Sequence, residues 1–352
     1  TAAVISEITA TARIENRTKT MRLRSVFLGG GTPTIMPAEQ LAAILDSLRE
    51  NYGLSPDGEF TLEANPGTVT SESLGQLRRA GFNRISFGLQ AAQPHLLQLL
   101  GRTHDMQDFV KSLELAKAAG FESCNADIMF GLPGQTVEDV EETVAKLLLL
   151  PIDHVSFYSL SLEEHTPLKA ACDQAPGLLP EEETERLQYR RIAQILKQAG
   201  FVHYEISNAA RPGRECLHNL VYWHARPYLG FGAAAHSYRR GVRRANVADI
   251  DEYIAVWTSG AGPSRLPFPG SDDLEIIDRE GAMKETMILG LRLLTGVSAA
   301  EFAGRFGVSL NDVFGPVIDR LAGRGLLAVQ DGRVRLTRTG LDLANQVFMA
   351  FI

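Results

Sequence analysis

The regular alternation of β-rich runs with amphipathic helical stretches constrains the fold of this chain more than any other feature of its sequence. Five runs typical of strands lie within residues 1–160, at RSVFLGG (24–30), EFTLEAN (59–65), RISFGLQ (84–90), ESCNADIMF (122–130) and HVSFYSL (154–160). The intervals carry apolar residues at helical spacing, as in AEQLAAILDSLRENYG. Strands joined by helical crossovers pair in parallel, so the sequence predicts an α/β fold with a parallel sheet or partial (β/α) barrel.

Three consecutive glycines, Gly29 to Gly31, directly follow the first run. Glycine loses more backbone entropy on folding than other residues, so this stretch suggests that a ligand approaches the main chain at a strand end. The loop GGGTPT lacks the Gly-Lys-Ser/Thr of a phosphate-binding P-loop, which excludes that site. A second stretch, GFGAAA (230–235), lacks the strand, helix and acidic residue of a dinucleotide site, and close backbone packing is its other interpretation.

The remainder of the chain is less regular. A helix is predicted between Pro180 and Gly200, and the strand-like HYEISN follows it. From Asp278 the pattern reads as helix, helix, turn, helix and a β-ribbon that turns at Asp-Gly, which is typical of a winged helix. We therefore expect three parts: a (β/α) barrel core in 1–170, an extension in 171–277 and a winged-helix-like domain in 278–352.

Composition excludes several classes of protein. The net charge of −7 gives no general attraction to nucleic acid or anionic lipid, and no apolar run approaches the roughly 20 residues that span a bilayer. The first residues lack the features of a signal peptide, so we expect a cytoplasmic protein. A DNA-binding use of the winged-helix-like segment is the weakest alternative, because its candidate recognition helix carries acidic and basic residues in balance, so packing or partner docking suits it better.

Several motifs together resemble a known family. GGGTP, LEANPG, NRISFGLQ, LGR and DIMFGLPGQ occur in this order at successive predicted strand ends. They resemble the radical S-adenosylmethionine (SAM) family related to oxygen-independent coproporphyrinogen III oxidase, which implies a radical SAM-type partial barrel. The later HNLVYW (218–223) and YLGFGAAAH (228–236) are similar to the HemW-type haem chaperones of that family. The resemblance covers nearly the whole chain.

The resemblance implies a SAM site, and the matching residues have suitable chemistry. Glycine carbonyls can accept from the SAM ammonium, Glu63 can accept from the ribose diol, and Arg102 can bind the carboxylate. The positions that match the family pattern are Gly30, Gly31, Thr32, Glu63, Gln90, Arg102 and Asp127. Ala91 stands where the family usually has a hydroxyl residue. Taken singly, these residues have other interpretations: a tight turn for the glycines, helix caps for Glu63 and Asp127, and a solvated charge for Arg102.

The family also implies a [4Fe-4S] cluster on a CxxxCxxC loop. This sequence contains no such loop, and its three cysteines, Cys124, Cys172 and Cys216, are too far apart to replace one. We expect the cluster cysteines to lie upstream of Thr1, and a cluster-free family member is the alternative. Within the sequence itself, no ligand of the cluster or of a separate metal ion is predicted, and the cysteines are expected to be reduced structural thiols.

Two activities follow from the resemblance. One branch decarboxylates porphyrinogen propionates, whereas the HemW-type branch binds haem and passes it to haem proteins; HNLVYW favours the second. Haem needs an axial ligand and an aromatic slot, and His218 with Tyr222 and Trp223 supplies these residue types. The alternative for His218 is donation to a buried carbonyl. The expected partners are haem and haem-accepting proteins, without nucleic acid or stable membrane insertion, and a homodimer is possible.

Overall fold

The computed structural model describes residues 1–14, 22–175, 177–259 and 274–352. The chain forms two compact units. The first, here called the barrel unit, contains Val26–Leu41 and Glu59–Glu215, and the second unit contains Thr1–Ser25, Ala42–Gly58 and Cys216–Ile352. Residues 260–273 of the predicted extension lie outside the described residues.

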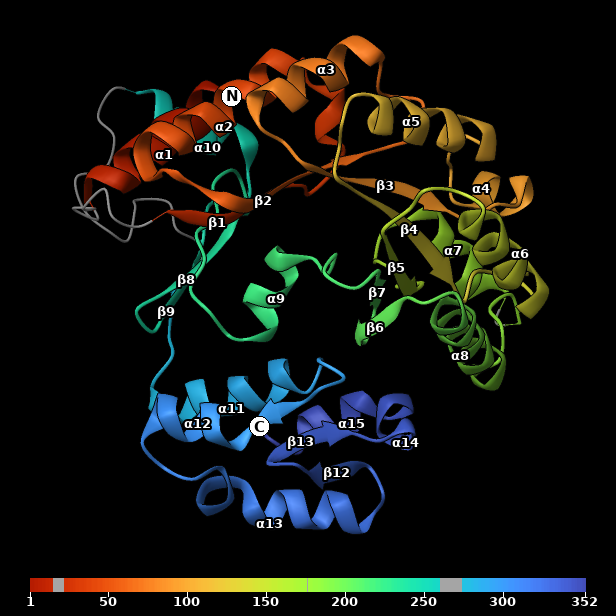
Figure 1. Ribbon diagram of the computed structural model, residues 1–352, viewed down its shortest axis with the longest axis vertical. Helices are drawn as coiled ribbons and strands as arrows, with labels where there is room; N and C mark the ends of the chain where they lie inside the picture. The colour runs from red at the N-terminus through yellow and green to blue at the C-terminus, as the bar shows by residue number, and fades with distance from the viewer. Residues whose placement is uncertain (15–21, 176, 260–273) are drawn as a thin grey trace. The chain divides into compact units, whose positions relative to one another are not determined.

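A seven-stranded sheet carries the fold (Figure 1). Its order is β1 (Leu23–Leu28), β2 (Leu54–Ala64), β3 (Arg84–Gln90), β4 (Ser123–Phe130), β5 (His154–Ser159), β7 (Asn208–Ala210) and β6 (Val202–Glu205). The strands β2 to β5 pair in parallel. All five strands predicted in residues 1–160 are confirmed, as is the partial (β/α) barrel. The predicted strand at HYEISN is instead a hairpin, because β6 and β7 pair antiparallel across Ile206 and Ser207.

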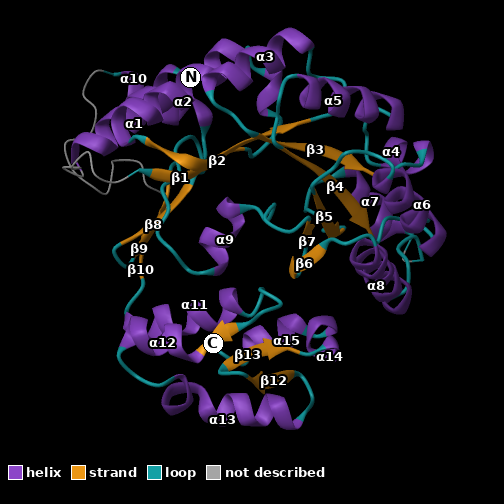
Figure 2. Cartoon of the chain, in the orientation of Figure 1, coloured by secondary structure: helices purple, strands orange, loops and turns teal. Residues whose placement is uncertain are grey.

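Helices follow the strands as the crossover pattern requires. They are α2 (Ala38–Tyr52), α3 (Ser71–Ala80), α4 (Pro94–Leu99), α5 (Met106–Ala118), α6 (Val137–Leu148), α7 (Pro167–Gln174) and α8 (Glu182–Gln198). Capping boxes at Thr70, Asp105 and Thr136 start three of them, each satisfying backbone N–H groups of the first turn. Figure 2 shows α3 and α5 on one side of the strands.

The interior strand β3 contributes to the core along its whole length. Every residue of β3 is buried, as expected for a strand covered on both faces. Phe87 packs edge-to-face on Phe109 of α5 with ring centroids 6.1 Å apart, and both side chains are fully buried. Burial of such side chains contributes roughly 2 kcal/mol each, which fixes the helices and so the strand ends.

The second unit begins with α1 (Ala2–Ile14), which packs on α10 (Ile250–Thr258). A small antiparallel sheet holds β8 (His236–Arg239), β9 (Val242–Ala245) and β10 (Leu274–Ile276), and α9 (Leu217–Trp223) precedes it. The fully buried Glu7 of α1 accepts hydrogen bonds from Gly232 N, Asn246 Nδ2 and Tyr253 OH. A Cβ on Gly230 would lie 2.2 Å from His236 O, so this glycine of GFGAAA serves close backbone packing, whereas Gly232 adopts a φ of +113°.

The chain ends in the predicted winged-helix-like domain. It contains α11 (Arg279–Gly290), β11 (Val297–Ser298), α12 (Ala299–Phe306), α13 (Leu310–Gly323), β12 (Leu327–Gln330) and β13 (Arg333–Leu336). Asp331 and Gly332 have φ of 53° and 69°, as a tight hairpin turn requires. Two short helices not predicted from the sequence, α14 (Arg338–Asp342) and α15 (Ala344–Met349), complete the domain.

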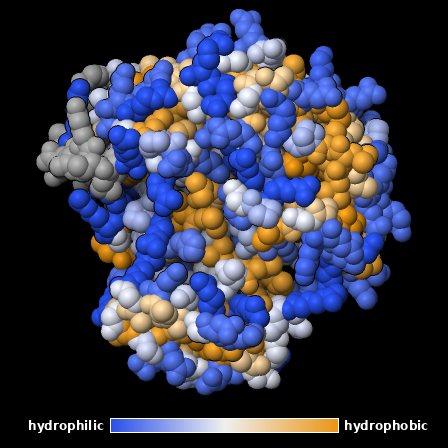
Figure 3. Space-filling view, in the orientation of Figure 1, coloured by the Kyte–Doolittle hydropathy of each residue, from blue (hydrophilic) through white to orange (hydrophobic). Residues whose placement is uncertain are grey.

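The visible face of the molecule mixes hydrophilic and apolar residues (Figure 3). Exposed large apolar side chains are spread along the chain, among them Ile35, Leu149 and Ile276. Scattered exposure of this kind is usual for folded proteins. No helix within the described ranges combines the length and apolar character needed to cross a membrane.

Candidate functional site

The glycine loop after β1 is built around Glu63. Gly30 N–H donates to Glu63 Oε2 at 3.2 Å, and a Cβ on Gly29 would lie 2.7 Å from Glu63 Cδ. A side chain at position 29 would therefore displace the Glu63 carboxyl group. Gly30 has a φ of +93°, and a Cβ there would meet no atom within 4 Å, so the loop presents open main chain at a strand end.

A second group of contacts joins the loop to Arg102. Asn65, which follows β2, donates from Nδ2 to Thr32 Oγ1 at 2.8 Å. Its Oδ1 accepts from Arg102 Nη1 at 3.2 Å. Arg102 is thus held by a neutral amide. Because this contact is not an ion pair, the positive charge of Arg102 stays available to a carboxylate of a ligand.

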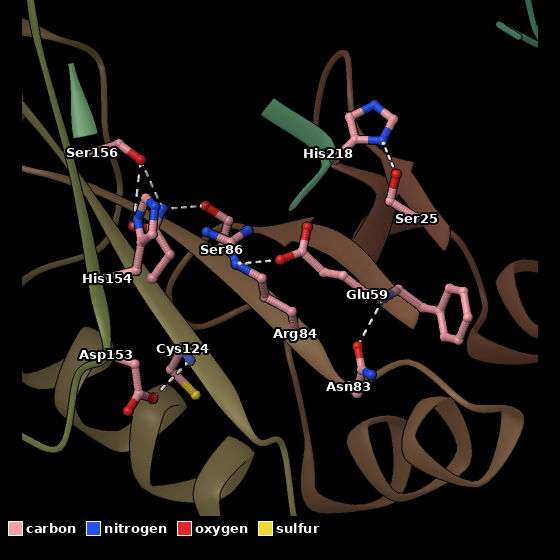
Figure 4. A network of polar contacts seen from close by, with 12 residues as sticks. Ser25, Glu59, Asn83, Arg84, Ser86, Cys124, Asp153, His154, Ser156 and His218 are labelled. Carbon is pink, nitrogen blue, oxygen red and sulfur yellow. Dashed lines mark hydrogen bonds and ion pairs between the residues drawn. The ribbon is translucent and has the colours of Figure 1, made fainter. Parts of the chain in front are cut away.

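Asp127 lies in a polar network on the neighbouring strands. Its Oδ2 accepts from Ser86 Oγ at 3.0 Å, and its Oδ1 accepts from Asn125 Nδ2 at 2.7 Å. Asn125 also contacts His154, whose Nδ1 lies 2.6 Å from Asn125 Oδ1. Figure 4 shows Ser86 of β3 and the two β5 residues of this network, His154 and Ser156. Hydrogen-bonding side chains on β3, β4 and β5 therefore fix the carboxyl group.

Gln90 ends β3 in an unusual backbone conformation. Its φ is 71°, in the left-handed region that residues other than glycine rarely adopt, and the register of β3 on β4 shifts between Gly88 and Gln90. Tyr158 OH donates to Gln90 Oε1 at 3.1 Å. Backbone strain of this kind costs on the order of 1–3 kcal/mol and clusters at functional sites.

The two carboxylates of the site share one electrostatic environment. Burial, followed by the repulsion of Asp127, raises the pKa of Glu63 to about 7, although the Gly30 N–H opposes this shift. Burial also raises the pKa of Asp127, against the hydrogen bonds from Ser156, Ser86 and Asn125. A cationic ligand between them would relieve both effects, because an opposite charge favours the ionised form.

The structure thus brings together the seven residues singled out for SAM: Gly30, Gly31, Thr32, Glu63, Gln90, Arg102 and Asp127. All seven belong to the barrel unit. The helix-cap interpretation of Glu63 and Asp127 is wrong, because their partners are the Gly30 N–H and the side chains of Ser86 and Asn125.

Sequence reasoning missed several members of this network. Asn65 and Asn125 stand two residues from Glu63 and Asp127, and residues two apart on a strand lie on the same face. That spacing was the available signal. Tyr158 lies near the end of β5, and the ends of parallel strands meet at one edge of the sheet, so its position in the sequence also indicated the site.

His218 lies in the second unit, apart from these seven residues in the division of the chain. Ser25 Oγ is 3.1 Å from its Nδ1, as Figure 4 shows, and Tyr222 OH is 3.0 Å from its Nε2. Each ring nitrogen therefore has a hydroxyl partner, where the alternative from the sequence was a backbone carbonyl. Tyr222 and His218 pack edge-to-face, with ring centroids 5.1 Å apart.

The three cysteines, Cys124, Cys172 and Cys216, are free and buried. Burial raises the pKa of the Cys124 thiol to about 11, which disfavours the thiolate that a metal would need. Among the residues the structure describes, no group of three or more His, Cys, Asp or Glu side chains could hold a metal ion.

Comparison with known proteins gives consistent matches. The radical SAM superfamily matches residues 6–147, and the HemN C-terminal domain matches residues 277–343. "Heme chaperone HemW" of Bacillus subtilis is 39% identical over 94% of this chain and 86% of its own length. The protein of the same name from Escherichia coli is 31% identical over 94% and 84%.

A solved structure matches the fold over almost the whole chain. It is the coproporphyrinogen III oxidase HemN of Escherichia coli, a radical SAM enzyme, with a TM-score of 0.82. The match covers 99% of this chain and 81% of that one, at 23% identity. At this identity the likeness establishes the shared fold.

Proposed function

The chain belongs to the HemW family of radical SAM proteins, and we propose from this that it is a haem chaperone, which binds haem and delivers it to haem proteins. The observation that carries the proposal is the similarity to chaperones of that name along 94% of the chain. The oxidase HemN shares the fold at lower identity, so coproporphyrinogen III oxidation remains the second candidate.

For haem, we propose His218 as the axial ligand. Imidazole is a common ligand of haem iron, and its second nitrogen usually donates to a fixed partner that orients the ring. The contact of Nδ1 with Ser25 Oγ supplies such a partner and leaves Nε2 on the side of Tyr222. Tyr222 adds aromatic surface next to this nitrogen, and Trp223 follows it on the same helix.

For SAM, we propose that the site consists of Gly30, Gly31, Thr32, Glu63, Gln90, Arg102 and Asp127. SAM supplies a sulfonium and a methionine group when bound to radical SAM proteins. Open backbone at Gly30 suits the ammonium, Glu63 suits the ribose diol, and Arg102 suits the carboxylate. The charge of Glu63 and Asp127 also complements a ligand that carries positive groups.

The family implies a [4Fe-4S] cluster as well as SAM. The cysteines present here do not fit that group, because they are buried and separate, and the sequence has no CxxxCxxC loop. The division at residues 170 and 277, the homodimer, the cytoplasmic location and the identity of the haem acceptors stay predictions.

The test separates a carrier from an oxidase. Under anaerobic conditions with SAM and a reductant, the protein should shift the Soret band of added haem and then transfer the haem to a haem-free globin. It should release no carbon dioxide from coproporphyrinogen III. Stoichiometric decarboxylation would overturn the chaperone function in favour of the oxidase, and the His218→Ala variant should show an altered Soret band.

A further inference from the structure

A cavity of about 230 Å³ lies at the end of α9, within the second unit. Four aromatic, two apolar and three charged residues line it. The lining residues are Tyr222, Trp223, Ala225, Arg226, Tyr228, Tyr238, Arg243, Glu285 and Leu289. Pockets that enclose a whole drug-sized ligand measure roughly 300–1,000 Å³, so this one suits the edge of a larger molecule.

The aromatic wall suits a flat apolar group. Tyr222 and Tyr228 pack edge-to-face with ring centroids 4.7 Å apart, and Tyr228 lies 6.4 Å from Tyr238. Ring edges and faces arranged in this way present apolar surface with hydroxyl groups at the tips. The edge of a conjugated macrocycle fits such a wall.

Two of the lining residues carry N–H groups that can donate to a ligand. Trp223 Nε1 is buried and has no hydrogen-bond partner among the described residues. Its N–H can only donate. Arg226 is exposed, and its guanidinium has no ion pair or hydrogen bond in the described part of the chain. Arg243 is different, because Glu285 and Glu275 accept from it at 2.7 and 2.9 Å.

Two donors, one of them cationic, call for an anionic acceptor. A carboxylate accepts from several donors at once and pairs well with a guanidinium. The one acidic residue of the lining, Glu285, is neutralised by Arg243, so it does not repel such a group. The ligand class that combines a flat apolar edge with a carboxylate is a porphyrin propionate edge.

Tyr222 joins this cavity to the proposed iron ligand. Its ring lines the cavity, and its hydroxyl is 3.0 Å from His218 Nε2. His218 and Tyr222 are four residues apart on α9, so they share one face of the helix. A macrocycle bound at Nε2 would therefore have an edge beside the cavity.

We propose that this cavity receives the propionate-bearing edge of haem, with Trp223 Nε1–H and Arg226 donating to the carboxylate. The proposal rests on the proposed haem-binding function and adds the site of a second anchor beside the iron ligand. Haem recognition then depends on the carboxylates of the cargo as well as on its iron.

The experiment compares haem with its dimethyl ester, in which both carboxylates are masked, by Soret titration of the wild-type protein. Haem should bind about tenfold more tightly than the diester, as expected for a charged hydrogen bond. The Arg226→Gln variant should lose most of this preference, and Trp223→Phe should lose part of it. Arg226 is exposed, so its replacement is not expected to disturb folding.

The matched control is Arg324→Gln, since Arg324 is also exposed and does not line the cavity. It should retain the preference for haem. Equal binding of haem and diester by the wild-type protein would overturn the propionate anchor and leave the chaperone function standing. An equal loss in Arg226→Gln and Arg324→Gln would also overturn it, by showing a general effect of charge. Failure to bind either compound would overturn both proposals.

Discussion

Ser25 Oγ lies 3.1 Å from His218 Nδ1, although 193 residues separate the two along the chain. Among the described residues, His218 Nε2 is the hydrogen-bond partner of Tyr222 OH. The phenol therefore forms a hydrogen bond when its proton points to that nitrogen. We therefore expect His218 to carry its own proton on Nδ1 and to donate to Ser25. This assignment leaves Nε2 as the nitrogen with a lone pair, which is the form that binds iron.

The Ser25→Ala variant should bind haem about tenfold more weakly, because loss of an orienting partner usually weakens a metal-binding histidine by roughly 10- to 100-fold. Soret titration measures this. Ser25→Thr keeps the hydroxyl and should restore affinity. In the haem-free protein, nitrogen NMR should find His218 protonated on Nδ1, and protonation on Nε2 would contradict the assigned tautomer.

The Tyr222→Phe variant should bind haem several-fold more tightly. Haem must displace the phenol from Nε2, and a hydrogen bond of this kind contributes about 1 kcal/mol, so its removal lowers the cost of binding. Stopped-flow absorbance should show faster association. Tyr238→Phe is the control, since Tyr238 lines the same cavity without a hydrogen bond to His218. Weaker binding by Tyr222→Phe would show that the hydroxyl assists haem.

SAM affinity should decrease as the pH falls from 8 to 6. The pKa of Glu63 is raised to about 7, so its carboxyl group becomes protonated over this interval and loses charge and acceptor capacity. Calorimetry should show a fivefold to tenfold loss of SAM affinity, because a group with a pKa near 7 loses about this much of its ionised form between pH 8 and pH 6. Asp127 and Tyr158 share this environment. Glu63→Gln should bind roughly 1–3 kcal/mol more weakly at pH 8 and lose the pH dependence.

The raised pKa of Glu63 also affects stability, and here a lower pH is favourable. The folded-state pKa of Glu63 exceeds its ordinary value of 4.5, so the folded protein binds more protons between these values than the unfolded chain. The contribution of Glu63 to the free energy of unfolding therefore falls as the pH rises from about 4.5 to about 7. If Glu63→Gln were as pH-sensitive as the wild type in urea unfolding, another group would be responsible.

The Glu7→Ala variant should lower the free energy of unfolding by about 3 kcal/mol. Glu7 is fully buried, and its removal leaves Gly232 N–H, Asn246 Nδ2 and Tyr253 OH without their acceptor. Urea unfolding measures the change. Glu39→Ala is the control, since Glu39 is exposed at the start of α2, and a similar loss there would argue against the buried network as the cause.

Features set by local sequence were predictable, and features set by distant contacts were not. The strands, the wing turn at Asp331 and the clustering of Glu63 with Asp127 follow from periodicity and from parallel strands ending at one edge. The hairpin of β6 and β7 was missed because its turn, Ile206–Ser207, has no glycine or proline signal. Nothing near Ser25 in the sequence indicates its contact with His218, which depends on tertiary packing.

The buried carboxyl group of Glu7 bears on how this chain is made. Its partner Tyr253 is 246 residues further along, and ribosomes add about 5–20 residues per second, so this contact has to wait on the order of 10–50 s after Glu7 is synthesised. Until then α1 lacks the Tyr253 hydroxyl that donates to Glu7, and it lacks the apolar surface of α10. Docking of α1 is therefore delayed until α10 has been synthesised, and its apolar face is available to cellular folding factors during that interval.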